Sequence, residues 1–285
     1  MKRSSMKYIA FTLALILALG LVSCGKKESE APAADEKQET QEEPEKQKEK
    51  QEKPDEPKAE VKKVKTDNIT INTQSSIRIE GSKTVYLDPY QRKQAPHDAD
   101  LILITHAHYD HYDPASIQNV LKDKGTVIVC PESMHAEVSQ MLAGLGKEYS
   151  LTGMEAGLEF TPTELSKDIK IKAVPAYNTN KTFHPKANGW LGYVLTLDGI
   201  RYFDAGDTDA IDEHKKIRCD VAFVPIGGTY TMTADEAAAD VNAFRPEIVI
   251  PIHYGSIVGS SEDEKRFEDQ VDDGIKVVAK VEDAK

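Results

Sequence analysis

The sequence predicts an α/β protein with one large folded domain, and three observations support that prediction. Short β-branched or apolar runs, typical of buried strands, alternate with stretches of helical composition from residue 66 to the C-terminus. These 220 residues are enough to bury a large core without a disulfide scaffold. The whole chain of 285 residues contains three cysteines, which excludes a cysteine-rich secreted mini-protein.

The order of the elements follows from these patterns. Three short β-branched runs come first, and the turn Glu80-Gly81-Ser82-Lys83 separates the second from the third. Apolar runs then alternate with longer helical stretches. Strands are expected at 69–71, 77–79, 85–87, 101–104, 126–129, 169–174, 191–197, 201–203, 221–224 and 248–252. Helices are expected at 114–121, 132–142, 234–244 and 262–272.

Residues 1–25 have the layout of a secretory signal peptide, with three cations and no acid around the apolar stretch 8–22. Fifteen apolar residues are short for a membrane span, which needs about 20. The segment Leu21-Val22-Ser23-Cys24-Gly25 resembles the lipobox of bacterial lipoproteins. That resemblance implies cleavage before Cys24 and lipidation of its thiol. The alternative is an ordinary N-terminal anchor helix with an incidental cysteine.

The predicted organisation is a signal peptide over 1–23, a lipidated Cys24 with a disordered charged tether over 24–65, and a folded domain over 66–285. Residues 26–65 contain 11 Lys and 13 acids but no aromatic, Leu, Ile, Met or Gly, so they cannot bury enough apolar surface to fold. We therefore expect a protein outside the cytoplasm, anchored to the cell membrane by its lipid.

The predicted domain is acidic, with 22 Lys and Arg against 35 Asp and Glu from residue 66 onward. Because Lys and Arg supply most non-specific affinity for phosphate backbones, nucleic acid is excluded as the main partner. An acidic domain can still bind an anion if metal ions supply the local positive charge. The oligomeric state is left open.

The strongest chemical signal is the segment Thr105 to His111 (THAHYDH), which directly follows an apolar run. Four potential ligands lie in it: His106, His108, Asp110 and His111. Three histidines so close together are costly for a core, whereas neutral imidazole is the commonest metal ligand. The segment therefore predicts a metal site, and the alternative is a solvent-exposed polar loop.

Two later segments repeat this construction. Asp207 lies in a glycine turn after the strand expected at 201–203, and His253 directly follows the strand expected at 248–252. The segments THAHYDH, AGDT, PIGGTYTM and PIHYG resemble motifs of the metallo-β-lactamase-fold hydrolases. The resemblance covers residues 68–280, and within that family it is to the branch containing ascorbate-phosphate lactonase. The resemblance implies an αββα four-layer sandwich with the metal site at one edge, between the two sheets.

The resemblance also implies two divalent metal ions, expected to be Zn, with Mn or Fe as alternatives. The implied ligands are His106 and His108 for the first ion and Asp110, His111 and His253 for the second, with Asp207 bridging both. Asp88, on an early strand, would orient a histidine ligand.

One ligand is less certain from the sequence. Family members place a histidine soon after the strand expected at 169–174, where this chain has Asn178. The nearest imidazole is His184, which we expect to swing in on its loop and complete the first metal site. The alternatives are Asn178 itself or an incomplete site.

The remaining histidines, His97, His135 and His214, are expected to be surface or packing residues. Cys130 and Cys219 are expected to be small, partly buried residues without a metal. A disulfide between them is permitted outside the cytoplasm, and sequence cannot give their separation.

The implied activity is hydrolysis of a small ester, lactone or phosphodiester by a metal-activated hydroxide, with Asp110 and Asp207 at the reacting centre. Lys186, Thr229 and Tyr230 are candidate substrate contacts. The alternatives are a phospholipid-directed phosphodiesterase and a non-catalytic metal- or ligand-binding lipoprotein. True β-lactamase activity is not expected, because Asp207 stands where the best-known zinc β-lactamases have a cysteine.

Overall fold

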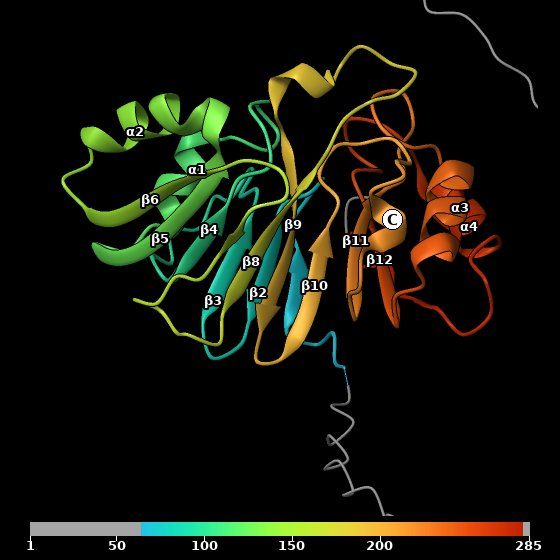
Figure 1. The fold of residues 1–285 in the computed structure, drawn as a ribbon, viewed down its shortest axis with the longest axis horizontal. Helices are drawn as coiled ribbons and strands as arrows, with labels where there is room; N and C mark the ends of the chain where they lie inside the picture. Colours follow the sequence, from blue (N-terminus) through green and yellow to red (C-terminus); the bar gives the residue numbers. More distant parts are fainter. Residues whose placement is uncertain (1–63, 282–285) are drawn as a thin grey trace, which may run out of the picture. The chain divides into compact units, whose positions relative to one another are not determined.

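The computed structural model describes residues 64–281 (Figure 1). The predicted signal peptide, Cys24 and nearly all of the predicted tether lie outside the described residues. Within 64–281, no helix has the length and apolar character needed to cross a membrane.

The described residues form two β-sheets flanked by helices. The first sheet has the order β1-β2-β3-β4-β5-β6. Its strands are β1 (Ile69–Ile71), β2 (Ile77–Glu80), β3 (Thr84–Leu87), β4 (Leu101–Leu103), β5 (Lys124–Pro131) and β6 (Glu148–Met154). The second sheet has the order β13-β12-β11-β10-β9-β8-β7. Its strands are β7 (Glu159–Phe160), β8 (Lys170–Pro175), β9 (Leu191–Leu197), β10 (Ile200–Asp204), β11 (Val221–Pro225), β12 (Ile248–Ile252) and β13 (Lys276–Val277).

The helices cover the outer faces of the two sheets. Figure 1 shows α1 (Pro114–Val120) and α2 (His135–Ala143) beside the first sheet, and α3 (Ala234–Phe244) and α4 (Ser261–Glu268) beside β11 and β12. Short 3-10 turns occupy η1 (Glu132–Met134), η2 (Lys186–Asn188) and η3 (His214–Lys216). The order of layers is therefore helix, sheet, sheet, helix, which confirms the αββα sandwich expected from the sequence.

Alternation along the strands builds the core. In β4, Leu101 and Leu103 join the larger apolar cluster, which contains side chains of both sheets, whereas Ile102 joins a smaller cluster with α1 and α2. In β3, Leu87 belongs to the larger cluster and Tyr86 to the smaller one. Successive side chains of a strand point to opposite faces, so β3 and β4 each contribute to two apolar layers.

Parallel pairing sets the position of the chemistry. β3, β4 and β5 are parallel neighbours in the first sheet, and β10, β11 and β12 are parallel neighbours in the second. The carboxyl ends of parallel strands meet at one edge, which is where open α/β sheets bind ligands.

The sequence predicted most of these elements, with three differences. Strands β6, β7 and β13 were not expected. β6 is an edge strand with mostly half-exposed side chains, so it lacks the apolar pattern of a buried strand. The helix expected at 132–142 is a 3-10 turn followed by α2, and the helix expected at 262–272 ends at Glu268.

Candidate metal centre

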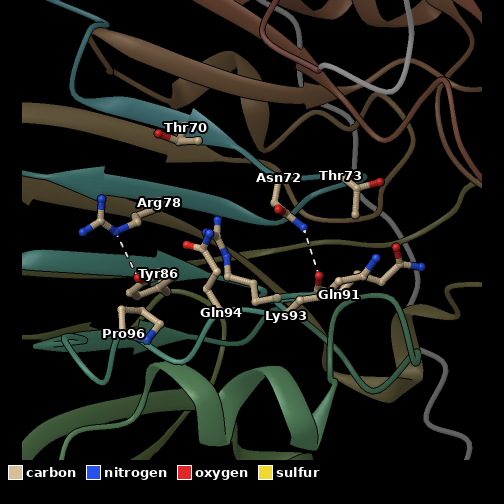
Figure 2. A pocket seen from close by; sticks show the side chains of 10 residues that line it. Thr70, Asn72, Thr73, Arg78, Tyr86, Gln91, Lys93, Gln94 and Pro96 are labelled. Carbon is tan, nitrogen blue, oxygen red and sulfur yellow. Dashed lines mark hydrogen bonds between the residues drawn. The ribbon is translucent and has the colours of Figure 1, made fainter.

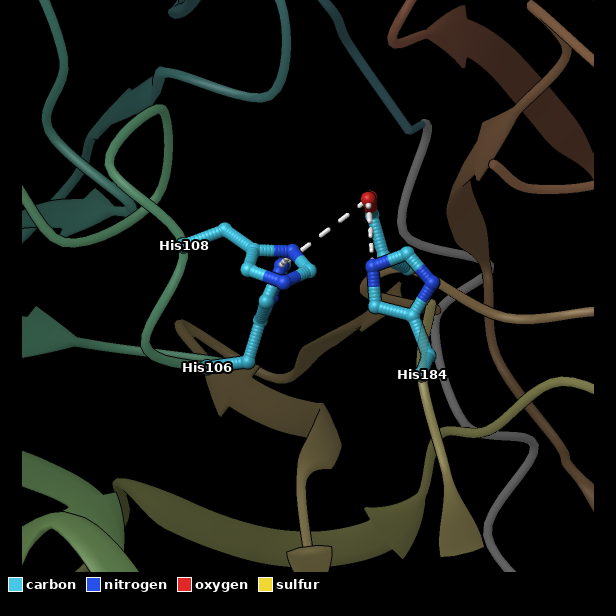
Figure 3. A group of neighbouring side chains, drawn as sticks. His106, His108 and His184 are labelled. Carbon is cyan, nitrogen blue, oxygen red and sulfur yellow. Dashed lines mark hydrogen bonds and ion pairs between the residues drawn. The ribbon is translucent and has the colours of Figure 1, made fainter. Parts of the chain in front are cut away.

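The ends of four strands bring the predicted ligands together between the two sheets. The segment 106–111 follows β4, Asp207 follows β10, and His253 follows β12. His184 comes from the loop that joins β8 to β9. Figure 3 shows His106, His108 and His184 converging from these different segments.

The first group of ligand atoms comes from three histidines and one carboxylate. His106, His108, His184 and Asp207 each offer an atom, and these atoms all lie within 4.8 Å of one another. Nε2 of His106 lies 3.1 Å from Nδ1 of His108, and Nε2 of His184 lies 3.1 Å from Oδ2 of Asp207. His106, His184 and Asp207 are buried, whereas His108 is partly exposed.

The second group contains Asp110, His111 and His253, all buried, and their ligand atoms also lie within 4.8 Å of one another. Oδ2 of Asp110 is 3.7 Å from Nε2 of His111 and 3.4 Å from Nε2 of His253. The two histidine rings are stacked, with centroids 5.4 Å apart.

Asp207 faces both groups. Its Oδ1 lies 3.3 Å from Nε2 of His111, and its Oδ2 lies 3.2 Å from Nε2 of His253 in the second group. The same Oδ2 lies 3.1 Å from His184 in the first group. This carboxylate therefore occupies the position from which a bridging ligand would reach two ions.

The donor atoms fit divalent metal ions. Nε2 of His111, His184 and His253 and Oδ1 of Asp207 are buried without a hydrogen-bond partner among the described residues. Unpaired buried polar atoms are costly, and these converge from several segments on shared points. Imidazole nitrogen with carboxylate oxygen is a donor set that suits zinc and several other transition metals.

The electrostatics of the cluster follow from burial and close opposite charges. Burial lowers the pKa of His106 well below its ordinary value, and His111 adds to that effect. Burial alone would also lower the pKa of His253, but Asp207 and Asp110 raise it to about 9. For His111 as well, Asp207 and Asp88 outweigh burial and raise the pKa.

Asp88 orients His111, as the sequence predicted. Its Oδ2 lies 2.7 Å from Nδ1 of the imidazole, and its Oδ1 accepts a hydrogen bond from the backbone N–H of Thr105 at 2.8 Å. The fully buried Asp88 has φ 43°, and His253 has φ 57°, in the left-handed region that favours glycine. Two non-glycine residues held in this region at the site carry local strain that the surrounding contacts must offset.

The structure places His184, rather than Asn178, among the candidate ligands. The His184 ring lies with its centroid 5.1 Å from that of His106 and 4.9 Å from that of His108. Asn178 lies behind it, with Oδ1 3.1 Å from Nδ1 of His184. The first group of candidate ligands therefore has an imidazole at this position.

A cavity of about 240 Å³ opens over the centre. Its mouth is apolar: Tyr109 is 65% exposed, Phe183 45% and Ile257 36%. Its lining residues are His108, Tyr109, Asp110, Phe183, His184, Asp207, Tyr230, His253 and Ile257. These apolar side chains come from three separate loops, so the apolar mouth is a feature of the assembled site.

Of the three predicted substrate contacts, Tyr230 lines the cavity, whereas Lys186 and Thr229 do not. The ammonium of Lys186 lies 3.3 Å from a carboxylate oxygen of Glu213 and 4.2 Å from the centre of the Tyr177 ring, so it is held elsewhere. Thr229 is an exposed turn residue with φ 44°. Both expectations are corrected by the structure.

Two residues of the site were missed from the sequence. The ring of Trp190 lies with its centroid 5.0 Å from that of His106 and 4.9 Å from that of His108. The sequence feature that could have drawn attention to it is that it is the one tryptophan of the chain. Asp204 is buried beside the centre, and burial with the nearby Asp88 raises its pKa to about 8. An aspartate that ends a strand gives no sequence signal of this environment.

The remaining predictions concern residues outside the centre. His97 is exposed, His135 is partly buried and His214 is fully buried, and none of them belongs to a ligand group. Cys130 and Cys219 are both buried and unpaired, so the permitted disulfide does not form.

Comparison with known proteins agrees with this geometry. Residues 67–254 match the model of the β-lactamase superfamily domain, and the chain belongs to this superfamily. Within it, the chain belongs to the UPF0173 metal-dependent hydrolases. It is 32% identical over 216 residues to the member from Thermococcus onnurineus, covering 72% of this chain and 92% of that protein. The identity to the Pyrococcus abyssi member is 32% over 213 residues, covering 70% and 90%.

Solved structures show the same fold. A protein from Parabacteroides distasonis described as a metal-dependent hydrolase is 34% identical, with a TM-score of 0.60 over 74% of this chain and 91% of that one. Igni18, a metallo hydrolase from Ignicoccus hospitalis, shares the fold at 23% identity, with a TM-score of 0.59 over 75% and 95%. The protein is therefore a metal-dependent hydrolase of the metallo-β-lactamase superfamily.

Proposed function

We propose that the protein hydrolyses a small ester, lactone or phosphodiester that carries an apolar group beside the bond to be cleaved. The observation that supports this is the apolar mouth of the metal cavity, formed by Tyr109, Phe183 and Ile257. Exposed side chains of this size bury apolar area when a substrate covers them, and that burial favours binding.

The residues of the centre divide the work. His106, His108 and His184 would hold one metal ion, Asp110, His111 and His253 a second, and Asp207 would contact both. The chemistry that divalent ions supply in such a site is Lewis-acid activation of water and of the substrate oxygen. Asp88 fixes the His111 ring through Nδ1, which leaves Nε2 directed into the site. Trp190 packs against the His106 and His108 rings and limits their movement.

Lactones are a favoured substrate class within this proposal, because the motifs resemble those of the ascorbate-phosphate lactonase branch. The lipobox-like segment around Cys24 supports a place of action outside the cytoplasm, at the membrane to which the lipid would anchor the chain. The acidic composition of the domain argues against nucleic acid substrates.

A second candidate is a phospholipid-directed phosphodiesterase. The exposed rings of Tyr109 and Phe183 at the mouth favour it, because aromatic side chains are well suited to a membrane interface. The lipid anchor proposed at Cys24 would place such an enzyme beside its substrate.

The test is a series of p-nitrophenyl esters from acetate to octanoate, with a lactone, a phosphodiester and a phospholipid measured alongside. We expect kcat/KM to rise with acyl length by up to about fourfold per methylene, the value for full burial of a CH₂ group. Phe183→Ala should flatten this dependence, whereas Leu158→Ala, which removes an exposed leucine outside the cavity, should not. Rates independent of acyl length in the unaltered protein would remove the apolar requirement from the proposal.

A further inference from the structure

A second cavity, of about 660 Å³, lies on the outer face of the first sheet (Figure 2). Its floor is formed by outward-facing side chains of β1, β2 and β3, including Arg78 and Tyr86, and its wall is the segment 91–96. Its lining residues are Thr70, Asn72, Thr73, Arg78, Tyr86, Gln91, Arg92, Lys93, Gln94 and Pro96. None of them lines the metal cavity, so the two sites are separate.

The cations of this cavity are not all neutralised. Arg78, Arg92 and Lys93 line it without an acidic residue among the lining residues, but Arg78 is paired with Glu80 and Asp98, each at 2.7 Å. Amide and hydroxyl groups make up most of the remaining lining, and these can donate hydrogen bonds to an anion. In a domain with a large excess of acids, Arg92 and Lys93, which form no ion pair within residues 64–281, indicate a site for negative charge at this polar cavity.

Arg92 is the central residue. Within residues 64–281 its guanidinium forms no ion pair, and its Nε is buried without a hydrogen-bond partner. Its one side-chain hydrogen bond runs to the backbone oxygen of Ser76 at 3.4 Å. The Asp98 carboxylate attracts the Arg92 guanidinium electrostatically without a direct contact. That carboxylate already accepts hydrogen bonds from Arg78 at 2.7 Å and from the Tyr86 hydroxyl at 2.8 Å. An arginine that is partly buried without a counter-ion is costly.

The position of Arg92 is fixed by contacts of its backbone and of its guanidinium. Its backbone N–H donates to the Ser116 hydroxyl at 2.8 Å, and its backbone oxygen accepts from Asn119 at 2.7 Å, both on α1. The guanidinium carbon lies 5.0 Å from the centre of the Tyr86 ring. A planar guanidinium held in this way is preorganised to bind an oxyanion through two parallel hydrogen bonds.

We propose that this cavity binds a phosphate-type oxyanion through Arg92 and Lys93, either on a small molecule or on a lipid headgroup. The inference does not depend on the proposed hydrolytic function, because it concerns binding at a site that shares no lining residue with the metal centre.

The test is calorimetric titration of the full chain, loaded with metal, with inorganic phosphate at constant ionic strength. Phosphate bound by the metal centre is separated by following the ¹H–¹⁵N signal of the Arg92 Nε, which we expect to shift and saturate. Arg92→Gln should weaken the binding at this cavity by about tenfold or more, and Arg92→Lys, which keeps the charge, by less. Arg218→Gln is the matched control, because Arg218 lies outside the cavity and bonds to backbone oxygens.

If Arg92→Gln fails to fold, Lys93→Gln replaces it, because Lys93 is exposed and its loss should weaken phosphate binding severalfold without disturbing the core. The proposal is overturned if the Arg92 signal does not respond to millimolar phosphate, or if Lys93→Gln and Arg218→Gln bind phosphate equally well. Sedimentation with phosphatidylcholine vesicles, with and without phosphatidylglycerol, distinguishes the sources. A headgroup site predicts less binding of the Lys93 variant to the anionic vesicles, and a site for a soluble anion predicts no difference.

Discussion

Asn178 holds both the backbone and the ring of His184. Its Oδ1 accepts a hydrogen bond from the His184 backbone N–H at 2.9 Å and lies 3.1 Å from Nδ1 of the ring. Its Nδ2 donates to Asp209 at 3.1 Å and to the backbone oxygen of Tyr230 at 2.9 Å, which fixes the orientation of the amide. With Nδ1 held in this way, Nε2 of His184 faces Asp207. Asn178, at the position where the family resemblance led us to expect a histidine, therefore positions His184 instead.

The first prediction separates a ligand from its support. His184→Ala should remove one metal equivalent from the protein, because no other imidazole can take its place in the first group. Asn178→Ala should keep the stoichiometry and weaken metal affinity by about 10- to 100-fold, as loss of an orienting partner does. Elemental analysis and competition with a chelator measure the two quantities.

The control for this prediction is Asn178→Asp. An aspartate has the size of Asn178 and keeps the oxygen that accepts from His184. It replaces the Nδ2 donor that faces Asp209 by a second oxygen, so two carboxylates would repel each other. Asn178→Asp should therefore weaken metal binding more than Asn178→Ala. Equal metal affinity in the unaltered protein and in both variants would show that Asn178 does not position His184.

The second prediction concerns Asp88. Asp88→Asn should weaken metal binding by the second group by about 10- to 100-fold, because the carboxylate that orients Nδ1 of His111 is lost. Asp123→Asn, a substitution of an exposed aspartate far along the first sheet from this contact, is the control and should have no effect. The measurement is metal affinity by competition; an unchanged affinity in Asp88→Asn would contradict the assigned role.

Most of the fold was predictable because its central strands are buried on both faces. β9 and β12 have the bounds expected from sequence, since both are continuous apolar or β-branched runs. β6 was missed because it is an edge strand with a polar sequence. Periodicity reports burial, so elements that are half exposed give a weak signal.

Some residues of the candidate site could likewise be predicted from the sequence, and others could not. His106, Asp207 and His253 follow apolar runs directly, so their convergence at strand ends could be predicted. Lys186 could not be placed, because its partner Glu213 is distant in sequence and draws it away from the cavity. The sequence did not indicate a role for Arg92 either. Only the folded structure shows that its guanidinium has no carboxylate partner within residues 64–281.

The third prediction concerns a buried pair outside the site. Nδ1 of His214 lies 2.6 Å from Oδ2 of Asp240 on α3, and both residues are buried. Asp240→Ala should lower the free energy of unfolding by about 1–3 kcal/mol, because a buried imidazole loses its partner. Asp212→Ala, which breaks the exposed contact with Lys215, should leave the urea midpoint unchanged. Equal midpoints for the two variants would contradict the structural role of the pair.

The fourth prediction concerns Cys130 and Cys219, which are buried and unpaired. Burial raises the pKa of each thiol from 9.0 to about 12, so almost no thiolate exists in the native protein at pH 8. Iodoacetamide should therefore modify both residues slowly in the folded state and rapidly in denaturant. Peptide-resolved mass spectrometry without reductant measures this, and a disulfide between the two would contradict the structure.

The same shifts set a pH dependence for stability. Above pH 9 the unfolded chain loses thiol protons that the folded chain keeps until about pH 12, so unfolding becomes more favourable as the pH rises through this range. The stabilisation is fully present below pH 9 and is lost towards pH 12. Urea unfolding between pH 8 and 11 should show a falling midpoint, and the variant with both Cys130→Ala and Cys219→Ala should show a shallower fall. An identical slope in the variant would mean that other buried groups, such as Tyr86, whose pKa burial raises to about 12, dominate the alkaline loss.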